Sequence, residues 1–337
     1  MKLKILILLF IIVQILTGNC DLKAQQDVQF SQYLFNSLFI NPAYAGYKED
    51  LYFNGVIRKQ WVNFPGAAET GAVSLDGLTN SETKNIGLGG QITWDRLGPQ
   101  TTTSVFGSYS YRIRLDEDDS KRLCIGFGFG FNQYSLDGTT FQYTDANDPL
   151  IPTGSLSVIK PDARVGIYYF TPTFFASLSG MDLFSLYNKG KIYLSNGTAI
   201  ASEAAAAHIY LSMGGLMNLS ENVKVKPSFM IKEDFHGPTS LDLNLFALLS
   251  EKLWVGTSYR TAVTLWHKSA IGSDLNKSGA LSIMAELFAT ERLRIGYSYD
   301  IITSNLSSYQ AGSHEISVGL LFPNNINAGR IKSPRYF

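Results

Sequence analysis

The segment Ser104–Leu115 reads SVFGSYSYRIRL, and two kinds of residue alternate along most of its length. One face carries apolar and aromatic side chains, namely Val105, Tyr109, Tyr111, Ile113 and Leu115. The opposite face carries serines and arginines, namely Ser104, Ser108, Ser110, Arg112 and Arg114. A period of two, with one apolar and one polar face, predicts a β-strand that separates two unlike environments.

The same alternation recurs in Cys124–Asn132 (CIGFGFGFN), in Val223–Lys232 and in Leu293–Asp300. An even number of strands is what a single-chain barrel requires when both ends of the chain lie on the periplasmic side. Residues 201–207 could instead begin a short helix. We expect about fourteen strands, roughly at residues 51–61, 69–78, 85–95, 102–115, 122–134, 162–170, 173–182, 204–214, 222–233, 238–249, 251–261, 279–289, 291–302 and 313–322.

A soluble β-sandwich would also alternate, but three features favour a membrane barrel. The segments are about ten residues long, which suits a tilted spanning strand. Aromatic residues gather toward segment ends, as they do in the interfacial girdles of membrane barrels. The apolar face recurs in segment after segment, and the mature chain has no apolar run of roughly 18 residues, the length of a spanning helix. We therefore predict an all-β protein, a transmembrane antiparallel β-barrel of the bacterial outer membrane.

The start of the chain has the pattern of an export signal. Lys2 and Lys4 precede an apolar run over residues 5–16, which is too short to span a bilayer as a helix. A cut after Ala24 gives a signal peptide over residues 1–24. A lipoprotein cut before Cys20 is the rival interpretation.

The rest of the chain divides into three parts. Residues 25–47 are an N-terminal plug or periplasmic segment, residues 48–323 form the barrel, and residues 324–337 form a C-terminal tail. Within the barrel, Asp145–Pro161 holds three prolines and is predicted to be a long loop. Removal of the signal leaves Cys124 as a lone cysteine, so no intrachain disulfide is expected. It also leaves 25 basic and 27 acidic residues, which gives no reason to expect nucleic acid as a partner.

The inward face of the predicted barrel carries charges of both signs. Fourteen strands enclose more space than side chains fill easily, so water, a plug or a polar network must occupy it. Strand parity places the following residues inside: Arg58, Gln60, Gln91, Asp95, Arg112, Arg114, Lys224, Lys226, Asp242, Arg260, Glu286, Arg294, Asp300 and Glu315.

Two features of this interior are specific hypotheses. Residues 25–47 are rich in aromatic and amide side chains and are the natural plug, although a periplasmic partner-binding arm is the alternative. The plug or partner residues are Gln29, Phe30, Tyr33, Phe35, Asn41, Pro42 and Tyr44. In a closed barrel the first and last strands are neighbours, which would allow Arg58 and Glu315 to form an ion pair across that seam, although water or other lumen residues could satisfy each charge instead.

No constellation predicts catalysis, a cofactor or a metal. Gly126, Gly128 and Gly130 are spaced by two and continue a strand, unlike a phosphate-binding loop. The four histidines show no H-x-x-x-H or H-E-x-x-H spacing. The acidic run Asp116–Asp119 lacks the alternating ligands and glycine of a calcium loop, so we expect a solvated turn.

A series of motifs extends in order over nearly the whole mature chain. It begins with QDVQFSQYLFNSLFINPAYAG (Gln26–Gly46) and RKQWVNFPGAAET (Arg58–Thr70). It continues through NIGLGGQITWDRLGP (Asn85–Pro99), the SYSYRIRL strand, LWVGTSYR (Leu253–Arg260), IGYSYDI, GSHEISVGLLF and the closing KSPRYF. Together these motifs resemble the PorP/SprF family of outer-membrane proteins of type IX secretion and gliding motility.

The resemblance implies a non-enzymatic outer-membrane component that supports export or surface attachment of a cognate secreted adhesin. The implied partners are outer-membrane lipid, the C-terminal domain of the adhesin, and the periplasmic ring or peptidoglycan-binding lipoproteins of the machine. The alternative function is an outer-membrane diffusion channel or a hydrophobic-substrate transporter of similar strand number.

Overall fold

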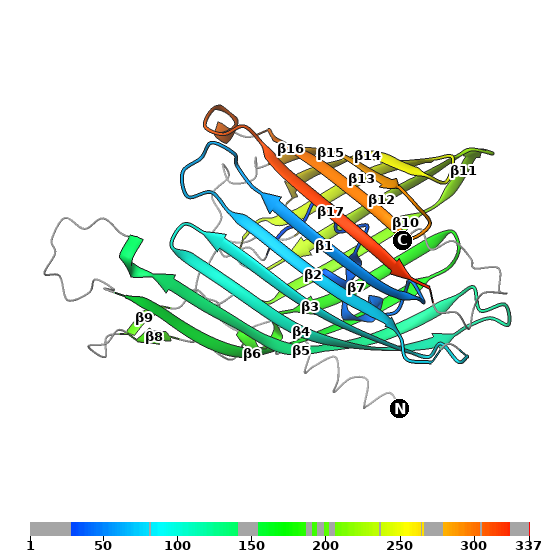
Figure 1. Ribbon diagram of the computed structural model, residues 1–337, viewed down its shortest axis with the longest axis horizontal. Helices are drawn as coiled ribbons and strands as arrows, with labels where there is room; N and C mark the ends of the chain where they lie inside the picture. The colour runs from blue at the N-terminus through cyan, green and yellow to red at the C-terminus, as the bar shows by residue number, and fades with distance from the viewer. Residues whose placement is uncertain are drawn as a thin grey trace, which may run out of the picture.

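The computed structural model describes residues 28–323 and Phe337, except residues 81, 141–153, 187–190, 194–198, 202–205, 236, 264, 266–278 and 304. Within this part of the chain, fourteen strands close into one antiparallel barrel, which confirms the predicted fold class (Figure 1). They are β1 (Leu51–Lys59), β2 (Glu69–Leu78), β3 (Ile86–Leu97), β4 (Gln100–Arg114), β5 (Arg122–Asp137), β6 (Ser155–Phe170), β7 (Phe174–Met181), β10 (His208–Gly215), β12 (Val223–Glu233), β13 (Thr239–Leu249), β14 (Leu253–Val263), β15 (Gly279–Phe288), β16 (Leu293–Ile302) and β17 (Ser313–Phe322).

Two pairings close the ring. The first and last strands, β1 and β17, pair along their whole length, and β10 pairs with β12. A short strand, β11 (Met217–Ser220), continues beside β12 where β10 ends, and Pro227 of β12 lies between these two neighbours. A proline has no N–H to donate, so it fits where a strand passes from one partner to the next. A separate hairpin joins β8 (Lys191–Tyr193) to β9 (Ala199–Ala201).

The connections differ in length between the two ends of the barrel. The turns at residues 171–173, 250–252 and 289–292 are short, whereas the connections at 138–154 and 182–207 at the other end are long. Outer-membrane barrels have short periplasmic turns and longer extracellular loops. The end at which β1 begins is therefore the periplasmic end.

The alternation read from the sequence matches the two faces of the wall. Outward-facing apolar side chains are well exposed, with Ile57 at 72% and Phe129 at 65%. Inward-facing polar residues of the same strands are buried, including Arg58 and Asn132. An exposed apolar band around a polar interior is the arrangement that lipid requires. Arg114, predicted to face inward, lies at the end of β4 and is exposed.

The predicted loop at Asp145–Pro161 is wrong for its last seven residues. Strand β6 begins at Ser155, and Pro161 lies within it opposite Phe131 of β5. The neighbour on the other side, β7, pairs with β6 only from Val165 onward. Pro161 therefore lies on a strand edge, where its missing N–H interrupts no ladder.

Other expectations fall outside the described residues. These are the signal peptide over residues 1–24, residues 202–205 of the possible helix at residues 201–207, and the tail apart from Phe337. No described helix has the length and apolar character needed to cross a membrane. The acidic turn is described: the Ser120 hydroxyl and the backbone N–H groups of Lys121 and Ser120 donate to Asp116, and these bonds lower the pKa of Asp116.

Candidate functional site: the lumen and its N-terminal segment

Residues 28–50, here called the lumen segment, run from the extracellular half of the interior down to the start of β1 (Figure 1, dark blue). Two short 3₁₀ turns shape it, η1 (Ser37–Phe39) and η2 (Pro42–Tyr44). Each turn is capped by an asparagine: the side-chain oxygen of Asn36 accepts from Leu38 N, and that of Asn41 accepts from Ala43 N. Asparagine is a preferred cap, and Pro42 fits the first position of a turn.

Glycines of the barrel wall make room for this segment. A Cβ atom at Gly126 would overlap the backbone of Ala43, and one at Gly166 would overlap the side chain of Asn41. Gly126 and Gly166 lie opposite each other on β5 and β6, so together they form a flat seat for η2. The segment approaches the wall so closely there that any larger side chain would displace it.

Asn41 binds the wall directly. Its Nδ2 atom donates to Ser177 Oγ at 2.7 Å and to the carbonyl of Ile167 at 3.0 Å. Its Oδ1 atom simultaneously holds the η2 cap. One side chain therefore shapes the turn and fixes it to β6 and β7.

A buried charge cluster binds the extracellular end of the segment. Arg58 lies 2.6 Å from Asp300 and 3.1 Å from Glu315. Glu315 accepts the backbone N–H groups of Ser31 and Gln32, both at 2.9 Å. The Ser31 hydroxyl accepts from Arg58 and donates to Asp300. The structure thus brings Arg58 and Glu315 together and adds a second carboxylate and the lumen segment to the cluster.

The remaining residues predicted for the segment also contact the wall or each other. Gln29 Oε1 accepts from Arg260, and the Tyr33 hydroxyl accepts from Asn244 at 2.9 Å. The ring of Phe30 packs on Phe39, that of Phe35 packs on Phe246, and Tyr44 Oη donates to the carbonyl of Phe337. Each of these side chains therefore makes a contact inside the barrel. That the segment blocks the passage of solutes through the lumen stays a prediction.

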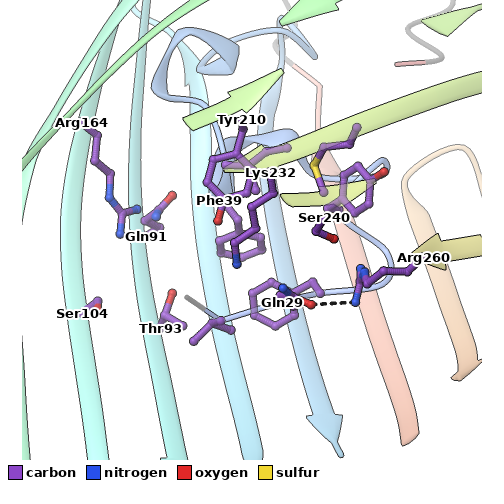
Figure 2. Close-up of a pocket in the computed structure, with 15 residues that line it drawn as sticks. Gln29, Phe39, Gln91, Thr93, Ser104, Arg164, Tyr210, Lys232, Ser240 and Arg260 are labelled. Carbon is purple, nitrogen blue, oxygen red and sulfur yellow. Dashed lines mark hydrogen bonds between the residues drawn. The ribbon is translucent and has the colours of Figure 1, made fainter. Parts of the chain in front are cut away.

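A vestibule lies between the first part of the segment and the wall, in the extracellular half of the barrel (Figure 2). Its space is ≈ 620 Å³ including solvent at its mouth, and it is lined by the wall and by segment residues from Val28 to Ile40. Cations reach it from three strands: Arg164 of β6, Lys232 of β12 and Arg260 of β14. Arg260 is paired with Asp242 at 2.8 Å, and the Arg164 guanidinium lies over the Phe106 ring. The lining therefore carries three cations, one of which is already paired with a carboxylate.

The described residues contain no group of three or more His, Cys, Asp or Glu side chains placed to hold a metal ion. The chemistry available in this lumen is hydrogen bonding, ion pairing and aromatic packing. Such an interior can hold a polypeptide, as it holds its own residues 28–50.

The sequence did not predict that glycines of the wall make room for the lumen segment, nor that Asp300 joins Glu315 in binding Arg58. The signal for the seats was present, because Gly87, Gly126, Gly166 and Gly296 all occupy positions where the wall meets the lumen segment. A glycine in a strand marks a bulge, a bend or a close backbone approach. Only the fold shows which segment makes that approach.

Cys124 gives a direct chemical test of this packing. It faces inward, is 2% exposed and belongs to the same buried cluster as Tyr44 and Tyr47. We expect a maleimide to label it slowly in the native detergent-solubilised barrel, and at least about tenfold faster after deletion of residues 28–45, since a bare lumen admits water. Mass spectrometry of timed samples measures the rate, with Cys124→Ser as the blank. Equal rates in the two proteins would contradict the packing.

Comparison with known proteins identifies a family. The model of the family described as "Type IX secretion system membrane protein PorP/SprF" matches residues 22–320. No curated protein matches the sequence significantly.

Among solved structures, similar folds include the CymD monoaromatic hydrocarbon channel, with 12% identity, a TM-score of 0.48, and coverage of 88% of this chain and 94% of that one. Another is Omp33 of Acinetobacter baumannii, with 10% identity, a TM-score of 0.44, and coverage of 81% and 98%. A third is a FadL homologue of Pseudomonas aeruginosa, with 12% identity, a TM-score of 0.42, and coverage of 90% and 96%. Likenesses this distant say nothing about what the chain binds or transports.

Proposed function

Because the chain belongs to the PorP/SprF family of type IX secretion system membrane proteins, we propose that it supports export or surface attachment of one cognate secreted adhesin. It is a multi-pass β-barrel of the outer membrane and a component of that secretion system. The proposal adds a non-enzymatic role, in which the lumen segment closes the barrel. The partners proposed are the C-terminal domain of the adhesin and the periplasmic ring or peptidoglycan-binding lipoproteins.

The observation that supports this proposal is the binding of the lumen segment to the inner face of the barrel. From Ser31 to Gly46 the segment bonds to inward-facing groups of the wall, including Glu315, Ser177 and Asp76. An open diffusion channel needs a continuous aqueous path, and a polypeptide segment bonded to the wall inside the barrel argues against such a path. A closed barrel suits a protein that binds and anchors partners better than one that passes small solutes.

Affinity purification tests the role. We expect the tagged protein, solubilised from its own outer membrane in mild detergent, to copurify with a large secreted protein and with periplasmic components of the secretion system. A tagged outer-membrane barrel of another family, prepared identically, is the control. If mass spectrometry finds no such protein above that control, the proposed role is wrong.

A further inference from the structure

Phe337 lies inside the barrel at its periplasmic end, where it is 3% exposed. Its ring packs on Phe175 of β7, with 4.9 Å between ring centroids. Phe175 in turn stacks on Tyr168 of β6. The wall therefore supplies one side of an aromatic pocket in which the Phe337 ring lies.

The lumen segment supplies the other side and binds the Phe337 backbone. Tyr44 Oη donates to the Phe337 carbonyl oxygen at 2.8 Å, and Lys48 Nζ donates to the same oxygen at 3.4 Å. The Phe337 N–H donates to Tyr47 Oη at 3.3 Å. The main-chain N–H and a main-chain oxygen of this residue are thus bonded to side chains and not to a strand ladder.

The two tyrosines are themselves held in place. Their rings stack on each other at 4.8 Å, and both meet Tyr168 edge-on. Tyr47 also packs against Phe170 at 4.9 Å. Rigid aromatic walls with hydroxyl groups at fixed positions are a prearranged binding site, because little side-chain freedom is lost when a ligand enters.

We propose that Tyr44, Tyr47, Lys48 and Phe175 form a peptide-binding site at the periplasmic end of the lumen. The site recognises an aromatic residue by its ring and by its main-chain N–H and C=O groups. Phe337 is its ligand in this chain. Because three of the four residues belong to the lumen segment, an occupied site also fixes the lower half of that segment. The inference stands whether or not the barrel serves secretion.

Binding in trans tests the site. The variant Phe337→Ala empties it, and the probe is a fluorescent, C-terminally amidated hexapeptide of residues 332–337, KSPRYF. We expect fluorescence anisotropy to show saturable binding to the detergent-solubilised Phe337→Ala barrel. The native barrel should bind far less, because its own Phe337 fills the pocket. The peptide KSPRYA should bind at least about tenfold more weakly, since it lacks the buried ring.

Two further variants make the test decisive. Adding Tyr44→Phe to Phe337→Ala removes one hydrogen bond without changing the ring, and we expect weaker peptide binding. In the full chain, Phe337→Ala should also speed maleimide labelling of Cys124 by several-fold, because the lower half of the segment loosens. Phe322→Ala is the matched control, since Phe322 is 50% exposed on the barrel exterior. Equal binding of KSPRYF and KSPRYA, or labelling of Phe337→Ala at the rate of Phe322→Ala, would overturn the inference.

Discussion

Replacement of Arg58 by glutamine destabilises the barrel by about 3–5 kcal/mol, the cost of breaking a buried ion pair from one side. The side chains of Asp300 and Glu315 are 4% and 0% exposed, and Arg58 contacts both. Without Arg58, two carboxylates remain buried close to each other with no cation between them. The midpoint and slope of urea unfolding from lipid vesicles measure this loss.

The companion variants separate charge from packing. Glu315→Gln should cost about 1.5–3 kcal/mol, because bonds to a charged group are lost while Arg58 keeps Asp300. The double variant Glu315→Gln/Arg58→Gln should lose more stability than Glu315→Gln alone, because Asp300 then loses its cation partner. The triple neutral variant, with Asp300→Asn as well, should regain much of the loss because no buried charge remains.

A surface pair is the matched control. Lys59 follows Arg58 in β1 and lies 3.6 Å from Glu69, with side chains 62% and 36% exposed. Lys59→Gln should change stability by at most about 1 kcal/mol. If Arg58→Gln is no more harmful than Lys59→Gln, the cluster does not stabilise the fold.

The strands could be predicted from the sequence wherever a wall separates lipid from lumen. In β5, phenylalanines face outward and glycines inward, so both the period and the direction could be read. The failure at the start of β6 has a physical cause. Ser155 and Ser157 are exposed there, and the exposed apolar side chains of the outer face begin only at Ile159. A strand that starts with serines on its outer face lacks the contrast on which the prediction depends.

The cluster around Arg58 could be predicted only in part. Parity places Arg58, Asp300 and Glu315 on the inner face, and closure makes β1 and β17 neighbours. Which carboxylates reach the guanidinium depends on the stagger between β16 and β17, where Asp300 lies opposite Ser313. Stagger is a property of the closed ring and not of any one strand. The contact of Ser31 with the cluster joins residues far apart in the chain, which no local pattern encodes.

We expect deletion of residues 28–45 to raise the ion conductance of the barrel from near zero to steady, large openings. The segment bonds to the wall from the charge cluster to the periplasmic end, and we propose that it fills the lumen there. Its removal would leave a polar interior through which water and ions can pass. A point variant is also needed, because the protein with the deletion could fail to fold. Gly126→Leu places a side chain where the backbone of Ala43 lies, so it should displace η2 and raise conductance while every strand remains. Gly90→Leu is its control, because a Cβ atom at Gly90 would meet no other part of the described chain within 4 Å.

Single-channel recording in planar bilayers tests most directly whether the lumen segment closes this barrel. The native protein and Gly90→Leu should insert with no more than brief, small openings. The protein lacking residues 28–45 should show steady, large openings, and Gly126→Leu should lie between them. A native barrel that conducts as steadily as the deletion variant would contradict the account.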